Sequence, residues 1–135
     1  MIFIDTGAFL ARYVARDQFH KKSVRGWNLI RKNRSQCFTS NFVLDETITL
    51  LGRQAGYEFS AERAFTFYRS EVLEILRPNS KDELEALEFF RKFSNQKVSF
   101  TDCISFVLMK RNRINLAFSF DRHFVLAGFD TFPAE

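Results

Sequence analysis

Residues 1–10 read MIFIDTGAFL, and this opening stretch predicts how the rest of the chain folds. Residues 2–4 are a short, β-branched-rich apolar run, which is typical of a strand buried on both faces. The run stops at Asp5, and an apolar, helix-like pattern starts at Ala8. A carboxylate therefore stands where an interior strand gives way to a helix, and ligands of open α/β sheets bind at that edge. Asp5 could instead cap the helix, which is a common use of Asp at such a junction.

Short apolar runs alternate with helix-like patterns along the whole chain. Further strands are predicted at QCFTS, VLEIL, LAF and FDTF, which are residues 36–40, 72–76, 116–118 and 129–132. This alternation is typical of βαβ units and predicts an α/β fold with a mainly parallel sheet. We expect one domain over residues 1–135, because the chain shows no internal repeat, low-complexity tract or interdomain linker.

Capping residues and apolar spacing place the helices. They are predicted to begin at residues 17, 40, 60, 80 and either 99 or 101, and a short helical turn ends at Gly128. In the helix from residue 80, Ser80 and Glu83 have the spacing of a capping box. Its expected core-facing stripe consists of Leu84, Leu87, Phe90 and Phe93. The apolar content of the helix from residue 60 is Ala64, Phe65, Phe67 and Tyr68.

The composition of the chain indicates which kinds of partner and which kinds of metal site to expect. The formal net charge of +4 and the pI of about 9.3 favour a polyanionic partner such as RNA. Phenylalanine supplies 18 of the 135 residues, so we expect an aromatic-rich core. Cys37 and Cys103 lie in apolar runs without metal-ligand spacing, which indicates reduced core cysteines. Two histidines, His20 and His123, are too few for a metal centre built from histidine.

Targeting and membrane signals are not apparent in the sequence. Asp5 interrupts the first apolar run and no basic segment precedes it, so we see no signal peptide. No apolar run approaches the roughly 18 residues that a membrane helix needs. We therefore expect a cytoplasmic protein without a membrane span.

Four acidic residues stand at comparable junctions between strands and helices: Asp5, Glu46, Asp102 and Asp121. Taken alone, each acid could simply cap a helix or interact with a helix dipole. The carboxyl edge of a parallel sheet can bring all of them together, and gathered carboxylates repel one another unless a cation lies between them. Mg²⁺ or Mn²⁺ suits such oxygen ligands, and a site of this kind can activate water to attack a phosphodiester. The neighbouring Asp45 competes with Glu46, but Glu46 has the more apolar helical neighbours and is the better candidate for the inward position.

Several other enzyme classes lack their motifs in this sequence. There is no phosphate-binding Gly-Lys-Ser/Thr loop, no G-x-G-x-x-G and no G-x-S-x-G elbow. A phosphatase with an aspartyl nucleophile usually carries a second acid two residues later, and that position here is Gly7. The acids therefore indicate metal-assisted hydrolysis of a phosphodiester rather than these alternatives.

The order and spacing of four segments resemble the PIN domain family, and most of all the VapC-type toxins of toxin–antitoxin pairs. The segments are IDTG, TSNFVLDE, FTDCIS, and FSFDRHF followed by Gly128. The resemblance covers nearly the whole chain and implies a three-layer α/β/α sandwich with a metal-dependent ribonuclease site. On this basis the metal-binding and catalytic residues are Asp5, Glu46, Asp102 and Asp121, and the small polar residues that support them are Thr6 and Ser119. The family also implies a homodimer and a small antitoxin protein whose peptide lies over the acidic groove.

The hypothesis that follows is an endoribonuclease that uses Mg²⁺ or Mn²⁺. Basic residues would hold the RNA backbone, since such contacts give affinity without sequence choice. The candidates are Arg12, Arg31, Lys32, Arg34, Lys110, Arg111, Arg113 and Arg122. Two alternatives stay open: a housekeeping RNA-processing nuclease without an antitoxin, and a binding module that contacts RNA or protein without catalysis.

Overall fold

A five-stranded parallel sheet forms the centre of the computed structural model, which describes residues 1–134. The strands lie in the order β3-β2-β1-β4-β5, and every pairing between neighbours is parallel. Their bounds are β1 Ile2–Ile4, β2 Cys37–Ser40, β3 Leu73–Leu76, β4 Leu116–Phe118 and β5 Asp130–Phe132. All five lie within the predicted runs, so the expected α/β fold with a parallel sheet is confirmed.

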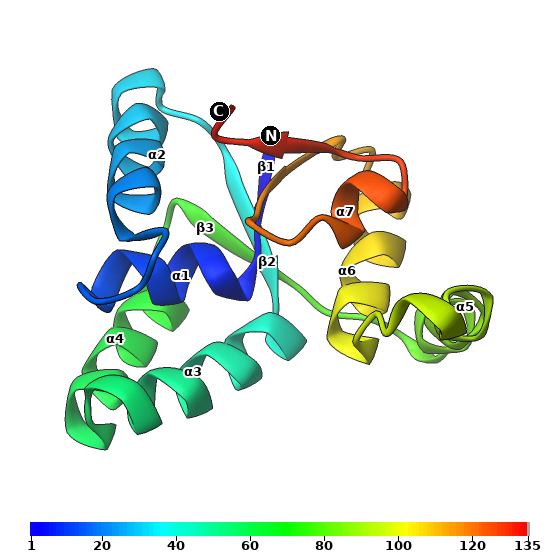
Figure 1. Ribbon diagram of the computed structural model, residues 1–135, viewed down its shortest axis with the longest axis horizontal. Coiled ribbons are helices and arrows are strands. Elements are labelled where there is room, and N and C mark those ends of the chain that lie inside the picture. Colours follow the sequence, from blue (N-terminus) through cyan, green and yellow to red (C-terminus); the bar gives the residue numbers. More distant parts are fainter. Residues whose placement is uncertain (135) are drawn as a thin grey trace.

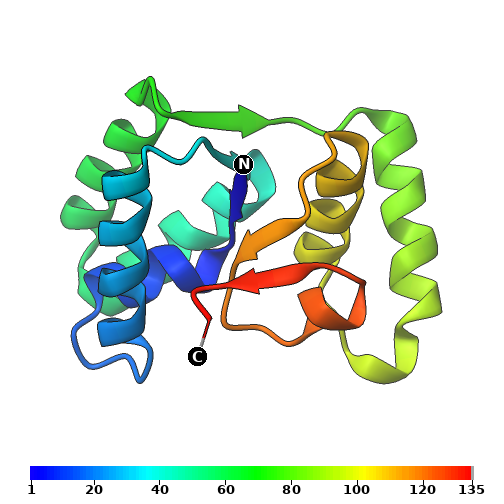
Figure 2. The same cartoon turned by 90° about the horizontal axis from the view of Figure 1, so that it is seen from above.

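Helices cover both faces of the sheet and complete a three-layer α/β/α sandwich (Figures 1 and 2). On one side lie α1 Thr6–Tyr13, α2 His20–Asn33, α3 Asn41–Ala55 and α4 Tyr57–Arg69. On the other lie α5 Ser80–Lys92, the 3-10 turn η1 Ser94–Gln96, α6 Phe100–Arg111 and α7 His123–Leu126. Helix α5 packs on α6 and forms the outer edge of that side. None of the helices in residues 1–134 is long and apolar enough to cross a membrane.

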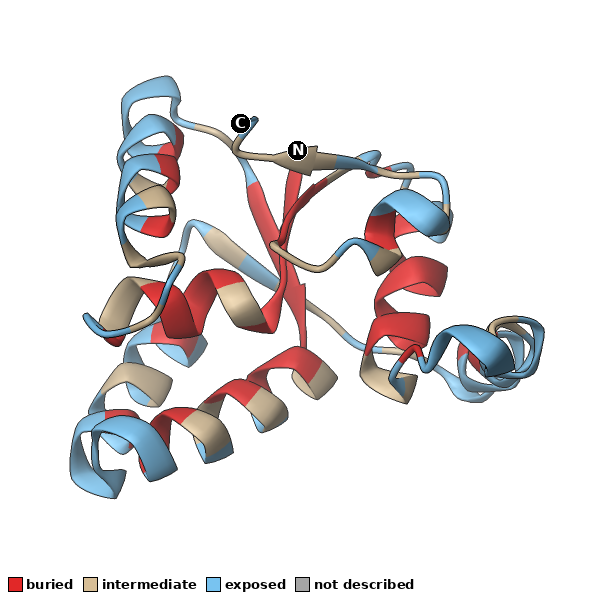
Figure 3. Ribbon diagram, in the orientation of Figure 1, coloured by how far each residue is buried: buried red, intermediate tan, exposed pale blue. Residues whose placement is uncertain are grey.

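The middle strand β1 is buried on both faces, as its apolar sequence predicts (Figure 3). It pairs with β2 on one side and β4 on the other, with Phe3 opposite Phe38 and Ala117. The core around it is rich in phenylalanine: fully buried rings come from Phe3, Phe9, Phe106, Phe118 and Phe124. Helix α2 approaches closely through Gly26, where a Cβ atom would lie 2.6 Å from the ring of Phe118. Cys37 and Cys103 are free and buried, as predicted.

Helix α5 presents a different face to the core than the sequence suggested. Leu84, Leu87 and Phe90 are 65%, 49% and 47% exposed, so the predicted core-facing stripe is wrong. The inner face instead carries the buried Ala86 and the partly buried Phe89, and Phe93 packs beside them. Both faces carry apolar residues at helical spacing, and the face with Ala86 is the one that is buried.

The capping box of α5 and the start of α4 also differ from prediction. The capping box of α5 lies one residue earlier than expected, because Asn79 accepts a hydrogen bond from the Asp82 amide and its own amide donates to the Asp82 carboxylate. Helix α4 starts at Tyr57 instead of residue 60, and Ser60 is buried within it, where it donates to the carbonyl of Ile48. Of the apolar residues expected to pack from α4, only Phe67 is buried, while Phe65 and Tyr68 are exposed.

The predicted N-cap of α3 is confirmed, whereas the predicted N-cap of α2 is wrong. The Ser40 side chain caps α3 by accepting from the Val43 amide, and Gly56 ends that helix at a φ of 102°. Helix α2 begins at His20, and Asp17 lies ahead of it in a turn, where its carboxylate accepts from the Phe19 amide. Asp17 therefore organises the approach to α2 without being its N-cap.

The revised orientation of α5 can be tested with two neighbouring substitutions. Leu87→Ala should change the free energy of unfolding by less than about 0.5 kcal/mol, because the side chain faces solvent. Ala86→Leu should lower it by about 1–3 kcal/mol, because added methylenes overpack a filled core. Urea unfolding of both variants measures the difference. The reverse ranking would restore the stripe that the sequence suggested.

Candidate active site

The four predicted acids lie around one groove at the carboxyl edge of the sheet. Asp5 directly follows β1, and Asp121 follows β4 after two intervening residues. Asp102 lies in the first turn of α6, and Glu46 lies on α3, which leaves β2 at the same edge. All four line a groove of about 680 Å³. Parallel pairing of β1 with β4 places Ile4 opposite Phe118, which brings the chain segments around residues 5 and 121 together.

Asp5 is buried and held by Ser119, the residue that follows β4. The Ser119 hydroxyl donates to Asp5 Oδ2 at 2.9 Å, and the same hydroxyl oxygen accepts from the Asp121 amide at 3.0 Å. Although Asp5 occupies the N-cap position of α1, its side chain makes no capping hydrogen bond. The alternative role of helix cap, left open by the sequence, therefore does not describe this carboxylate.

Asp102 and Glu46 also line the groove, and helix capping does not explain their positions. The N-cap of α6 is Ser99, whose hydroxyl accepts from the Asp102 amide at 3.0 Å, so the Asp102 carboxylate is not needed as a cap. Asp102 is buried, with 6% of its surface exposed. Glu46 is partly buried and lines the groove, whereas Asp45 is exposed.

Burial and the neighbouring carboxylates raise the pKa values of Asp5 and Asp102. Burial is the largest cause for Asp5, whose pKa rises from 3.8 to about 7 against hydrogen bonds from Ser119 and the Thr6 backbone; Asp121 and Glu46 add to the rise. For Asp102, burial and then the charges of Asp5, Asp121 and Glu46 raise the pKa to about 9. Ionising all four acids at neutral pH is therefore unfavourable without a cation in the groove.

The donor set fits a divalent metal ion. The acids offer the oxygen ligands that Mg²⁺ and Mn²⁺ take in proteins, and their mutual repulsion is what such an ion relieves. Thr6 Oγ1 is also buried beside Asp5 and has no hydrogen-bond partner among residues 1–134. Asp5, Glu46, Asp102 and Asp121 are thus the residues that could hold the ion.

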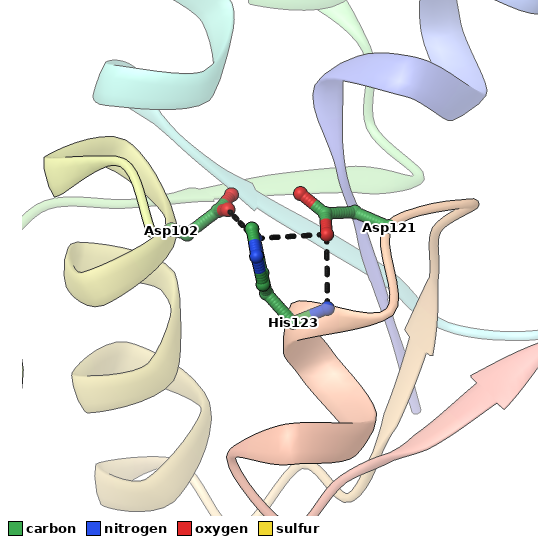
Figure 4. A group of neighbouring side chains, drawn as sticks. All are labelled: Asp102, Asp121 and His123. Carbon is green, nitrogen blue, oxygen red and sulfur yellow. Dashed lines mark hydrogen bonds and ion pairs between the residues drawn. The ribbon is translucent and has the colours of Figure 1, made fainter. Parts of the chain in front are cut away.

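A histidine joins this group, and sequence reasoning missed it. Asp102, Asp121 and His123 each offer a ligand atom, and these atoms lie within 4.8 Å of one another. Figure 4 shows the His123 ring reaching the carboxylates of Asp102 and Asp121. The sequence feature that could have revealed this role is the position of His123 two residues after Asp121. The turn between them brings the His123 amide to the Asp121 carboxylate. Counting histidines excluded a site made of histidine alone, but not one mixed with carboxylates.

Only part of the predicted basic set lies at the groove. Arg122 lines it, together with Lys97, which the sequence did not single out. Arg12, Arg31 and Arg34 instead line a separate cavity of about 530 Å³ beside Trp27. Arg111 pairs with Asp82 at 3.1 Å. Exposed positions at or just beyond the C-terminal ends of α2 and α6 hold Lys32, Lys110 and Arg113.

The chain is similar to known proteins over nearly its whole length. The model of the PIN domain family matches residues 2–130. The chain belongs to the PIN domain family. This confirms the resemblance drawn from the four sequence segments.

The relatives of this PIN domain include VapC-type proteins from bacteria and archaea. The 23S rRNA-specific endonuclease VapC20 of Mycobacterium tuberculosis is 34% identical over 96% of this chain and 95% of its own length. A VapC ribonuclease of Archaeoglobus fulgidus is 33% identical over 91% of this chain and 78% of its own. The crystal structure of M. tuberculosis VapC20, described as a sarcin–ricin loop cleaving toxin, superposes with a TM-score of 0.85 and covers 96% of both chains.

The raised pKa values predict how metal-free stability depends on pH. In the unfolded chain Asp5 and Asp102 ionise near 3.8, whereas in the fold they hold protons up to about pH 7 and 9. Their contribution to stability is therefore fully present below pH 3.8 and is lost as pH rises through the folded pKa values. We expect chelator-treated protein to lose more than about 1 kcal/mol between pH 5 and 9 through these groups.

Asp102→Asn should remove a large part of that loss, and Asp45→Asn, which changes an exposed neighbour of Glu46, should leave it intact. Urea unfolding of wild type and both variants across this pH range in a chelator gives the comparison. Parallel pH profiles for wild type and Asp102→Asn would show that the carboxylates do not repel as described.

Proposed function

We propose that this PIN domain is a metal-dependent endoribonuclease of the VapC toxin type that cleaves RNA phosphodiester bonds. The observation that carries the proposal is the convergence of four carboxylates, two with strongly raised pKa values, in one groove of the fold. The likeness to VapC20 along almost the full length supports the same activity. Its substrate, 23S rRNA, is the first RNA to test, and the sarcin–ricin loop is the first site within it.

Each residue of the groove has a distinct role in this proposal. Asp5, Asp102 and Asp121 would bind Mg²⁺ or Mn²⁺, and Glu46 would bind it directly or through water. The bound ion would lower the pKa of a water molecule and stabilise the charge that develops on the phosphodiester. Ser119 fixes the Asp5 carboxylate by its hydrogen bond and so keeps the ligand in place without the ion.

Basic residues would hold the RNA backbone around this centre. Arg122 and Lys97 lie at the groove itself and are the nearest candidates for a phosphate flanking the cleaved bond. Arg12, Arg31 and Arg34 lie around a different cavity, so they would contact nucleotides of the RNA that lie further from the cleaved bond. Lys32, Lys110, Arg111 and Arg113 remain proposed contacts of the same general kind.

VapC relatives also suggest the partners. We propose a small VapB-type antitoxin that covers the acidic groove, and a homodimer as the working assembly. A housekeeping nuclease would have the same groove without the antitoxin, and a neighbouring short gene for such a protein separates these two readings. The non-catalytic module is disfavoured by the site itself, because the side chains of Asp5 and Asp102 do not cap α1 and α6.

Asp102→Asn separates catalysis from a structural role. The change keeps the shape of the side chain but removes a charged ligand, so RNA cleavage should fall by orders of magnitude. Stability without metal should stay equal or rise, because one repelling carboxylate is gone and the capping hydroxyl of Ser99 remains. Cleavage of labelled RNA containing the sarcin–ricin loop, with Mn²⁺ added, is the measurement.

The matched control for this experiment is Asp45→Asn, which makes the same chemical change at an exposed position and should cleave like wild type. Full activity in Asp102→Asn would remove this residue from the proposed site. An equal loss in both variants would indicate a general charge effect rather than a lost ligand.

A further inference from the structure

The backbone around His123 holds this residue at the groove that the four acids line. It is the first residue of α7, and its amide donates to Asp121 Oδ1 at 2.9 Å. The next residue, Phe124, is fully buried in the core and anchors the turn. The imidazole of His123 therefore lies against Asp121.

The nitrogen Nδ1 of this ring lies close to two carboxylates at once. It is 3.0 Å from Asp121 Oδ1 and 3.6 Å from Asp102 Oδ2 (Figure 4). These contacts join residues from α6, the segment after β4 and α7. A ligand atom from each of the three residues falls within a sphere that one metal ion can span.

Despite this closeness, Nδ1 makes no hydrogen bond. The atom is buried; Asp121 Oδ1 is near enough but lies off the direction that a hydrogen bond from the ring requires, and Asp102 Oδ2 is too far away. Buried polar atoms nearly always form a hydrogen bond, so a ring nitrogen that contacts two carboxylates without one needs an explanation. The other histidine, His20, provides a contrast, because its Nδ1 lies 2.7 Å from the carbonyl of Ala11 and is paired.

We propose that Nδ1 of His123 is a metal ligand together with Asp102 and Asp121. The inference rests on the proposed metal-dependent function and specifies the ion that the groove prefers. Imidazole nitrogen is a ligand of transition metals, whereas Mg²⁺ is bound almost entirely by oxygen. A site with one imidazole and several carboxylates therefore selects Mn²⁺ over Mg²⁺.

Electron spin-echo envelope modulation of bound Mn²⁺ tests the ligand directly, because it detects a coordinated imidazole nitrogen without any need for activity. The chain has only two histidines, so the assignment requires one control. Wild type and His20→Gln should both show the nitrogen coupling, and His123→Phe should lose it. If the His123 variant does not fold, coupling that persists in His20→Gln still assigns the nitrogen to His123.

Calorimetric titration measures how His123 changes the affinities for Mn²⁺ and Mg²⁺. His123→Phe should weaken Mn²⁺ binding at least tenfold and change Mg²⁺ binding less than about threefold, because only the transition metal gains from the nitrogen. His123→Asp, which replaces nitrogen by oxygen, should shift the preference toward Mg²⁺. A wild-type protein that binds Mn²⁺ without nitrogen coupling overturns the role of His123 alone. A wild type that binds neither ion overturns the metal-dependent function as well.

Discussion

The cost of gathering carboxylates in one groove, two of them buried, is the constraint on which the candidate site depends. Removing a carboxylate from water costs several kcal/mol even after relaxation, and here the chain gathers four acids whose charges act on one another. Such a cluster is stable at neutral pH only if protons or a cation compensate it. The raised pKa values of Asp5 and Asp102 describe the first case, and a bound divalent ion would provide the second.

The parallel sheet explains how residues so far apart in sequence form this cluster. Pairing β1 with β4 aligns the ends of two strands, so Asp5 and Asp121 leave the sheet at the same edge. Ser119 then ties them together, because its hydroxyl donates to Asp5 and accepts from the Asp121 amide. The apolar strand β1 is packed at the centre of the core. This packing keeps the carboxylates close together although their charges repel.

Sequence reasoning was most successful where the chemistry lies at strand ends. The positions of Asp5, Asp102 and Asp121 follow from strand and helix boundaries, and parallel topology brings them to one edge. It failed for α5, because both the stripe of Leu84, Leu87 and Phe90 and the face with Ala86 carry apolar side chains. Only packing against α6 determines which face is buried.

The remaining differences also come from tertiary contacts. His123 belongs to the groove because the turn after β4 folds back on Asp121, and no count of histidines reveals that geometry. The arginines at residues 12, 31 and 34 share a cavity with Trp27 only after α1 and α2 pack together. Local spacing therefore located the acids, while the arrangement of cationic and imidazole groups required the folded chain.

The most direct measurement is the melting temperature of the chain with and without divalent metal at neutral pH. An ion that binds the folded groove and not the unfolded chain must stabilise the fold by mass action. Millimolar Mg²⁺ or Mn²⁺ should raise the melting temperature by several degrees, and Asp5→Asn should reduce this shift. Identical melting curves for wild type with metal and with chelator would contradict the account, because the carboxylates would then form no metal site.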